Sequence, residues 1–222
     1  MPPGSLPEGR PIPLLLLHGL GQSPLAWQDV VSALGAGRPM HAPWMKGLKP
    51  TDARGFDLSA AAATVADELE LQGIRQADVL GVSLGASVAL RLAVERPELV
   101  GRLVLAGALV RPSRLGLSLQ RAALRLVPGA RLVDAGVSRQ RMLDAIQALR
   151  TLDATSLLRE VAVPTLVVAG SRDRAGMQAA TQLARGIRGA RLEVVDGAGA
   201  LLNVDAPRAL ADLTRGFLER TA

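Results

Sequence analysis

Five residues near the middle of the chain have the spacing of a nucleophilic serine. They form a G-x-S-x-G pattern made of Gly81, Val82, Ser83, Leu84 and Gly85. The apolar run at residues 77–80 indicates a short buried strand, and the Ala-, Leu- and Val-rich run at residues 86–95 is typical of a helix. A strand-to-helix turn this tight strains its central residue and lifts the Ser83 hydroxyl clear of the backbone. The pattern therefore predicts a positive φ at Ser83, with its Oγ at the mouth of a pocket.

Predicted strands and helices alternate along the rest of the chain. We expect strands at residues 13–17, 38–41, 99–106, 163–170 and 190–195, and helices at residues 24–34, 57–71, 176–186 and 207–219. Because each parallel crossover needs a helix, the alternation predicts an α/β fold with a doubly wound, mostly parallel sheet. No internal repeat or low-complexity linker divides the chain, so we expect one domain over residues 1–222.

Residues 110–159 interrupt this alternation. Their Leu and Met residues suggest two or three helices, which is too much for a simple crossover, so we expect a helical lid above the carboxyl ends of the strands. The alternative is a set of structural helices without a gating role. Between Arg111 and Arg150, eight arginines oppose only Asp134 and Asp144, so this segment accounts for the whole net charge of +6. The arginines could attract an anionic substrate or a membrane surface, or form a solvated face.

Composition narrows the classes of partner and compartment. The chain has no cysteine, which excludes disulfides and thiolate metal sites and fits a reducing compartment, so cytoplasm is the default. No apolar run approaches the 18 or so residues that span a bilayer, and residues 1–6 lack a signal-peptide pattern. Nucleic-acid motifs, metal clusters and a dinucleotide loop are not visible, so we expect no nucleic-acid partner and no cofactor. The oligomeric state stays open.

Several motifs, in their order along the chain, resemble the α/β-hydrolase superfamily. They are His18-Gly19-Leu20-Gly21 after the first strand, the elbow at Ser83, the strand at residues 165–170 leading to Asp173, and Gly197-Ala198-Gly199 before the last helix. The resemblance runs from about residue 12 to the C-terminus and implies that Ser83 attacks a carbonyl carbon. It also implies that the backbone N–H groups of Leu84 and Leu20 form an oxyanion hole, in which losing one donor typically costs about 10²–10³ in rate.

The same resemblance assigns the acid and the base of a catalytic triad. It places the acid at Asp173, since residues 106–110 after the preceding strand hold no carboxylate. The alternative for Asp173 is a helix N-terminal acid. Ala200 stands where the family has its histidine, and without a base Ser83 stays protonated at neutral pH and is a poor nucleophile. Two histories fit, a histidine replaced to disable turnover or a natural loss of the base.

The chain has only two histidines. We expect His18, in the oxyanion loop, to be a buried structural residue. His41 follows a predicted strand whose carboxyl end should face the pocket rim, so it could reach the site as a base, although its position matches no triad role. His41 and Trp44 are our candidate substrate contacts.

The resemblance implies a serine hydrolase scaffold that acts on a carboxylic ester, a lactone or a similar acyl compound. The apolar lid suggests a small or medium hydrophobic substrate. We expect activity to be strongly impaired in this chain because Ala200 replaces the base. Ser83 argues against haloalkane dehalogenases and epoxide hydrolases, whose nucleophile is a carboxylate. Two other classes stay open, a non-catalytic ligand-binding protein and a lyase or isomerase of the same fold.

Overall fold

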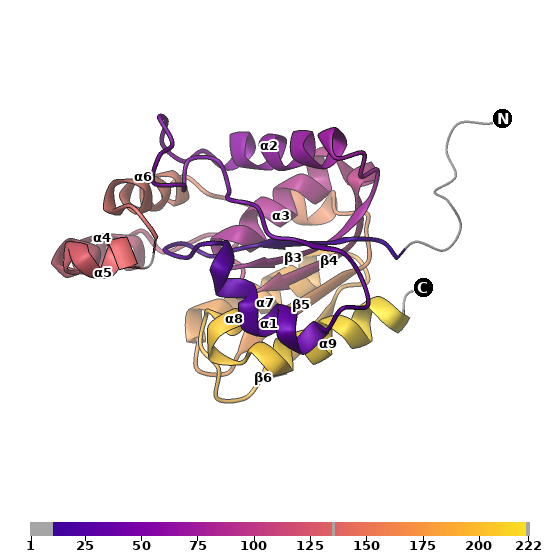
Figure 1. The fold of residues 1–222 in the computed structure, drawn as a ribbon. Helices are drawn as coiled ribbons and strands as arrows, with labels where there is room; N and C mark the ends of the chain where they lie inside the picture. Colours follow the sequence, from indigo (N-terminus) through magenta and orange to yellow (C-terminus); the bar gives the residue numbers. More distant parts are fainter. Residues whose placement is uncertain (1–10, 135, 221–222) are drawn as a thin grey trace.

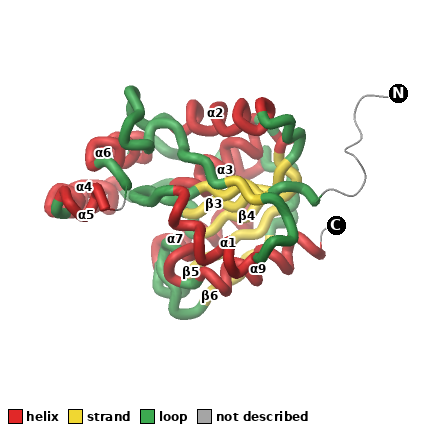
Figure 2. Tube along the Cα trace, in the orientation of Figure 1, coloured by secondary structure: helices red, strands yellow, loops and turns green. Residues whose placement is uncertain are grey.

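A parallel sheet forms the centre of the molecule (Figures 1 and 2). The computed structural model describes residues 11–134 and 136–220. Within these residues six strands lie in the order β2-β1-β3-β4-β5-β6, and every neighbouring pair is parallel. The strands are β1 (Leu14–Leu17), β2 (Met40–His41), β3 (Ala77–Val82), β4 (Val100–Ala106), β5 (Thr165–Gly170) and β6 (Arg191–Val195). This confirms the predicted α/β sheet. The predicted absence of a leader at residues 1–6 lies outside the described residues.

Helices cover both faces of the sheet. One face packs against α1 (Gln28–Leu34) and α9 (Pro207–Arg220), and the other against α2 (Leu58–Leu71), α3 (Leu84–Glu95) and α7 (Arg174–Gly186). Successive residues of β1 enter opposite layers, because Leu14 and Leu16 join the core under α1 and α9 whereas Leu15 and Leu17 join the core under α2 and α3. A strand that is buried on both faces is a continuous apolar run rather than an alternating one.

Two local elements differ from the sequence prediction. The segment predicted as one helix at residues 24–34 begins with a 3-10 turn (Pro24–Trp27), in which the side chain of Trp27 is buried, before α1 starts. A short helix, α8 (Leu202–Asp205), lies between the Gly-rich loop and α9 and was not predicted. At α2 the start is as expected, since the Asp57 side chain accepts a hydrogen bond from Ala60 N at 2.8 Å and caps the helix.

Residues 110–159 form a helical insertion. Its helices are α4 (Arg114–Leu126), α5 (Gly129–Asp134) and α6 (Arg139–Leu149), followed by a 3-10 turn (Leu157–Arg159). Figure 1 shows α4, α5 and α6 beyond the carboxyl ends of the strands. Met142 of α6 lies against the loop after β1, since a Cβ added to Gly21 would come within 2.7 Å of its Cε. A gating role for this insertion stays a prediction.

The arginines of the insertion divide into two groups. A solvated face was one expectation for them, but only four of the eight are exposed, namely Arg111, Arg114, Arg125 and Arg131. The half-buried ones tie the insertion together. Arg139 donates to the carbonyl oxygens of Leu124 and Val127, and Arg150 donates to Ser118 Oγ at 3.2 Å. Arg121 also donates to Gln147 of α6, so three of the eight arginines join α6 to α4, whereas Arg141 pairs with Asp144 within α6.

Candidate active site

Ser83 occupies the turn between β3 and α3. Its φ is 52° and its ψ is −114°, and it is the residue with positive φ among the described residues other than glycine. The Ser83 N–H donates to Ala106 O at 2.9 Å, which fixes the turn against the end of β4. The side chain is half-buried, and its Oγ makes no hydrogen bond within residues 11–134 and 136–220. The predicted strained conformation is therefore present, with a hydroxyl that no base contacts.

The two glycines of the elbow are required by close backbone approach. A Cβ added to Gly81 would lie 2.6 Å from Ala86 Cα, and a Cβ added to Gly85 would lie 2.5 Å from Leu17 C. Real Cβ atoms do not approach backbone atoms so closely. The glycines let α3 begin directly against the end of β1, which brings the first turn of the helix next to the loop at residues 18–21.

That loop is held by side-chain amides. Gln22 N donates to Gly19 O at 3.2 Å, and Gly19 N donates to Gln22 Oε1 at 2.8 Å, so both ends of the turn are closed. The Leu20 N–H has no acceptor within the described part of the chain, and the Leu84 N–H, at the start of α3, has no intrahelical acceptor. An N–H group without an acceptor can donate to a developing oxyanion, so both groups keep the chemistry that the predicted oxyanion hole requires.

A buried amide pair links this loop to the segment that follows Ala200. Gln22 Nε2 donates to Asn203 Oδ1, and Asn203 Nδ2 donates to Gln22 Oε1, both at 3.2 Å. Asn203 Nδ2 also donates to Ala26 O at 3.1 Å. Sequence reasoning missed this pair, because the two residues are 181 positions apart and a single chain holds no signal that they meet.

Asp173 begins α7 at the carboxyl end of β5. Its Oδ1 accepts a hydrogen bond from Gly176 N at 2.9 Å, so it serves as the helix N-cap, the alternative named for it above. Its Oδ2 accepts no hydrogen bond within the described residues. Since one carboxylate can accept several hydrogen bonds, capping leaves Oδ2 available to orient an imidazole.

Ala200 lies in the loop that crosses the carboxyl ends of β4 and β5. Its carbonyl oxygen lies against Gly107, the residue directly after β4, so closely that a Cβ at Gly107 would clash with it. The neighbouring Arg172 N donates to Ala198 O at 3.0 Å, which joins this loop to the segment that carries Asp173. Ala200 is exposed. Ser83 and Ala200 thus flank the end of β4, and the segments that carry Asp173 and Ala200 meet at the carboxyl end of β5.

His18 is buried next to the oxyanion loop. Its side chain is fully enclosed, with Nδ1 3.1 Å from Gly19 O and no partner for Nε2 in the described residues. Burial lowers the pKa of His18 to about 4, an effect that its hydrogen bond to Gly19 partly opposes. At neutral pH the ring is therefore uncharged. The placement agrees with a structural histidine.

The depressed pKa of His18 predicts a loss of stability in acid. His18 takes up a proton near pH 6.5 in the unfolded chain but only near pH 4 in the folded chain. The contribution of neutral, buried His18 to the free energy of unfolding is therefore complete above pH 6.5 and is lost as the pH falls to 4. We expect about 3 kcal/mol of unfolding free energy to be lost across this window. Urea unfolding across it should show a smaller loss for His18→Gln, and an unchanged loss for the control His41→Gln. Equal pH slopes in His18→Gln and the parent would contradict this assignment.

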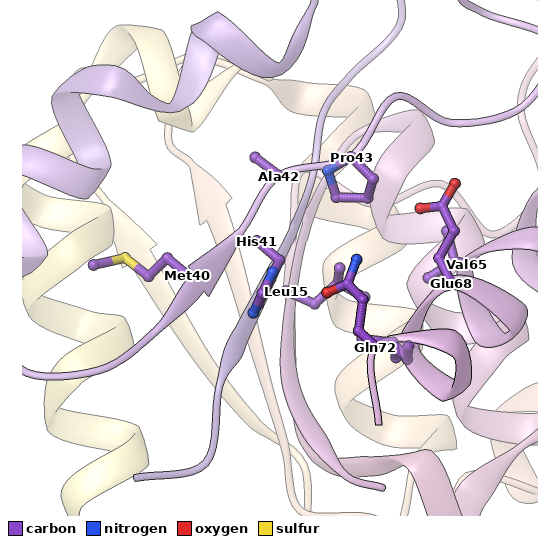
Figure 3. Close-up of a pocket in the computed structure, with 9 residues that line it drawn as sticks. Leu15, Met40, His41, Ala42, Pro43, Val65, Glu68 and Gln72 are labelled. Atoms are coloured by element: carbon purple, nitrogen blue, oxygen red, sulfur yellow. The ribbon is translucent and has the colours of Figure 1, made fainter. Parts of the chain in front are cut away.

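His41 lies in a different hollow of the surface. Figure 3 shows it at the end of β2, facing α2 and its residues Glu68 and Gln72, around a hollow of about 310 Å³. Burial raises the pKa of Glu68. His41 of β2 and Val79 of β3 both pair with Leu15 of β1, so they lie at the same level of the sheet, two strand spacings apart. Ser83 lies four residues beyond Val79, which places the Cα atoms of His41 and Ser83 on the order of 16 Å apart. This position argues against His41 as a base or a substrate contact at Ser83.

Trp44, the second candidate contact, lies closer to the oxyanion loop. Its ring meets His18 edge-on, with ring centroids 5.3 Å apart and an interplanar angle of 82°. Ser83 does not line the hollow at His41, nor the hollow between α4 and α7. The side chains of Met142 and Leu201 approach the loop at Gly21 and Gly19 and fill space beside it.

Comparisons with known proteins agree with this geometry. A model of the alpha/beta hydrolase family matches residues 14–213. A 2-hydroxymuconate semialdehyde hydrolase from Pseudomonas sp. (strain CF600) is 35% identical over 108 residues, which is 46% of this chain and 38% of that protein. A pimeloyl-acyl-carrier-protein methyl ester esterase from Neisseria meningitidis serogroup C is 28% identical over 240 residues, with 92% of both chains covered. This chain spans less than two-fifths of the length of the first two curated relatives that it matches.

Solved structures share the fold. A hydrolase from Pseudomonas aeruginosa PA01 superposes with a TM-score of 0.82 and 23% identity, covering 96% of this chain and 91% of the other. The enol-lactonase from Burkholderia xenovorans LB400 gives a TM-score of 0.83 and 20% identity, covering 95% and 92%. At these identities the likeness establishes the arrangement of sheet and helices, within which Ser83, Asp173 and Ala200 have been placed.

Proposed function

This chain belongs to the alpha/beta hydrolase family, and from that premise we propose that it is a serine hydrolase scaffold for a carboxylic ester, a lactone or a similar acyl compound. Relatives named as a methyl ester esterase and a semialdehyde hydrolase support this substrate class. The observation that carries the proposal is the strained elbow, which holds Ser83 at a φ of 52° beside two unpaired N–H groups. Such strain is retained where it serves a reaction.

The steps available to these residues follow from the geometry. The substrate carbonyl carbon would meet Ser83 Oγ while its oxygen points to the N–H groups of Leu84 and Leu20. As the tetrahedral centre forms, the carbonyl oxygen becomes negative, and both donors stabilise it. The Ser83 proton must leave at the same time. The Ala200 side chain has no atom that can accept it, and Ser83 Oγ has no hydrogen-bond partner among the described residues, so proton removal limits the rate.

We therefore propose that this chain binds acyl compounds but turns them over slowly. A fluorophosphonate probe measures the intrinsic reactivity of Ser83 without requiring deacylation. We expect slow, saturable labelling of one site, lost in Ser83→Ala and unchanged in His41→Ala, with mass spectrometry of the labelled peptide as the measurement. Labelling that persists in Ser83→Ala would remove the serine from the site. Labelling that is lost in His41→Ala would make His41 the base despite its distance.

A non-catalytic ligand-binding protein is the second candidate. The observation that favours it is the exposed Ala200 beside an otherwise complete elbow, since binding needs no base. The same experiment separates the two. A binding protein would show no labelling of Ser83 at any probe concentration, while an acyl ligand would still raise its melting temperature.

A further inference from the structure

Helix α4 carries an apolar stripe that faces solvent. Leu115, Leu119 and Leu126 are 70%, 63% and 84% exposed, and the exposed Ala122 lies between them. Their spacing of four, three and four residues places all of them along one side of the helix. The side that faces the protein has its own leucines, Leu117 and Leu124, which are buried. The exposed stripe is therefore not needed to hold α4 in the fold.

The charge beside this stripe has one sign. Helix α4 contains Arg114, Arg121 and Arg125 and no acidic residue, and the sequence holds no Asp or Glu between Glu98 and Asp134. Arg114 and Arg125 are exposed, and at about 100° per residue they lie along one border of the leucine stripe. Leucines flanked by arginines on a surface helix are the pattern of a segment that lies in the interface of an anionic bilayer.

The helix that carries the stripe lies at one end of the molecule. Figures 1 and 2 show α4 and α5 at the end of the molecule farthest from the amino ends of the strands. The nearby hollow of about 380 Å³ is lined by other residues of α4, such as Leu117 and Gln120, and by α7. A row of exposed leucines on a helix at one end of the molecule can meet a flat, deformable surface.

We propose that α4 docks this protein peripherally on an anionic lipid surface. The leucines enter the boundary between headgroups and acyl chains, and Arg114 and Arg125 contact lipid phosphates. A second copy of the chain fits less well, because pairing two α4 helices along their stripes would set arginines against arginines with no acid between them. In this orientation the carboxyl end of the sheet, with Ser83, faces the lipid. The proposal does not depend on turnover.

Vesicle flotation of the full chain tests the proposal. The probes are vesicles of phosphatidylcholine alone and of phosphatidylcholine mixed with phosphatidylglycerol. We expect binding to the mixed vesicles that weakens with salt, and little binding to the neutral ones. Replacing the stripe with Leu115→Gln, Leu119→Gln and Leu126→Gln should weaken binding roughly tenfold or more. Replacing Arg114→Gln and Arg125→Gln should weaken it roughly 10- to 30-fold, on the anionic vesicles only.

Matched controls use residues of the same type elsewhere. Leu25→Gln with Leu71→Gln changes leucines that are 69% and 87% exposed, and Arg188→Gln with Arg208→Gln removes two exposed arginines; both pairs should bind like the parent. Circular dichroism should show every variant folded, since all these side chains face solvent. No binding to anionic vesicles, or unchanged binding of the triple leucine variant, would overturn the proposal. A dimer that disappears in that variant would replace lipid with a second copy, and binding to soluble polyglutamate without vesicle binding would replace it with an acidic protein.

Discussion

Ala200→His is expected to raise the turnover of short-chain nitrophenyl esters by about 10²–10⁴-fold. A histidine at this position would extend from the loop at the end of β4, beside the turn that holds Ser83. Its Nδ1–H could donate to Asp173 Oδ2, which is free in the described structure, and its Nε2 could then take the serine proton. The gain should stay below the roughly 10⁶ that loss of a triad histidine costs in subtilisin, because the surrounding packing is adjusted to alanine.

Three further variants show whether the restored residues act as one unit. Ser83→Ala in the Ala200→His background should abolish the gain, and Asp173→Asn should remove most of it, since a triad loses its rate when any member is lost. His41→Ala should leave the restored rate unchanged. The measurement is kcat and KM for a series of esters. Equal turnover by the parent and by Ala200→His, with both rates lost in His41→Ala, would show that position 200 never carried the base.

The parts of the site that sequence could predict are those set by local rules. The G-x-S-x-G pattern between an apolar run and a helical run allows one backbone path, and the observed φ of Ser83 follows from it. The leucine run likewise predicted a strand at residues 13–17, and the observed β1 is buried on both faces. In both cases the residues that determine the structure are neighbours along the chain.

The parts that sequence could not predict depend on distant contacts. Sequence allowed His41 to reach the site because it follows a predicted strand, whereas β2 is a two-residue edge strand in which His41 pairs with Leu15, two residues before the end of β1. The pair Gln22 and Asn203 and the contact of Arg139 with two carbonyls of α4 join segments whose proximity only the fold determines. Asp173 is a third case, because an aspartate directly before a helix can serve as its N-cap, as the acid of a triad, or as both, and sequence alone does not distinguish these roles.

Gly85→Ala is expected to destabilise the protein by about 3 kcal/mol or more. Within a helix this substitution would ordinarily stabilise by about 0.5–1 kcal/mol, because alanine has less backbone freedom to lose. Here the new Cβ would lie 2.5 Å from Leu17 C and 2.6 Å from His18 O. These are backbone atoms at the end of β1, which is paired on both sides, so they cannot move aside without breaking the pairing with β3. Urea denaturation followed by circular dichroism measures the loss.

Gly216→Ala is the matched control, because Gly216 also lies within a helix, α9, and its nearest neighbour is the flexible end of Arg220 at 3.6 Å. We expect it to raise stability by about 0.5–1 kcal/mol. The opposite signs would isolate the contact between α3 and β1 as the cause. If Gly85→Ala relieves the clash by moving α3, the Leu84 N–H moves away from the Leu20 N–H, and the folded fraction should label more slowly with fluorophosphonate. A Gly85→Ala variant as stable as Gly216→Ala would mean that α3 does not begin against β1, and the oxyanion hole inferred from that contact would be lost with it.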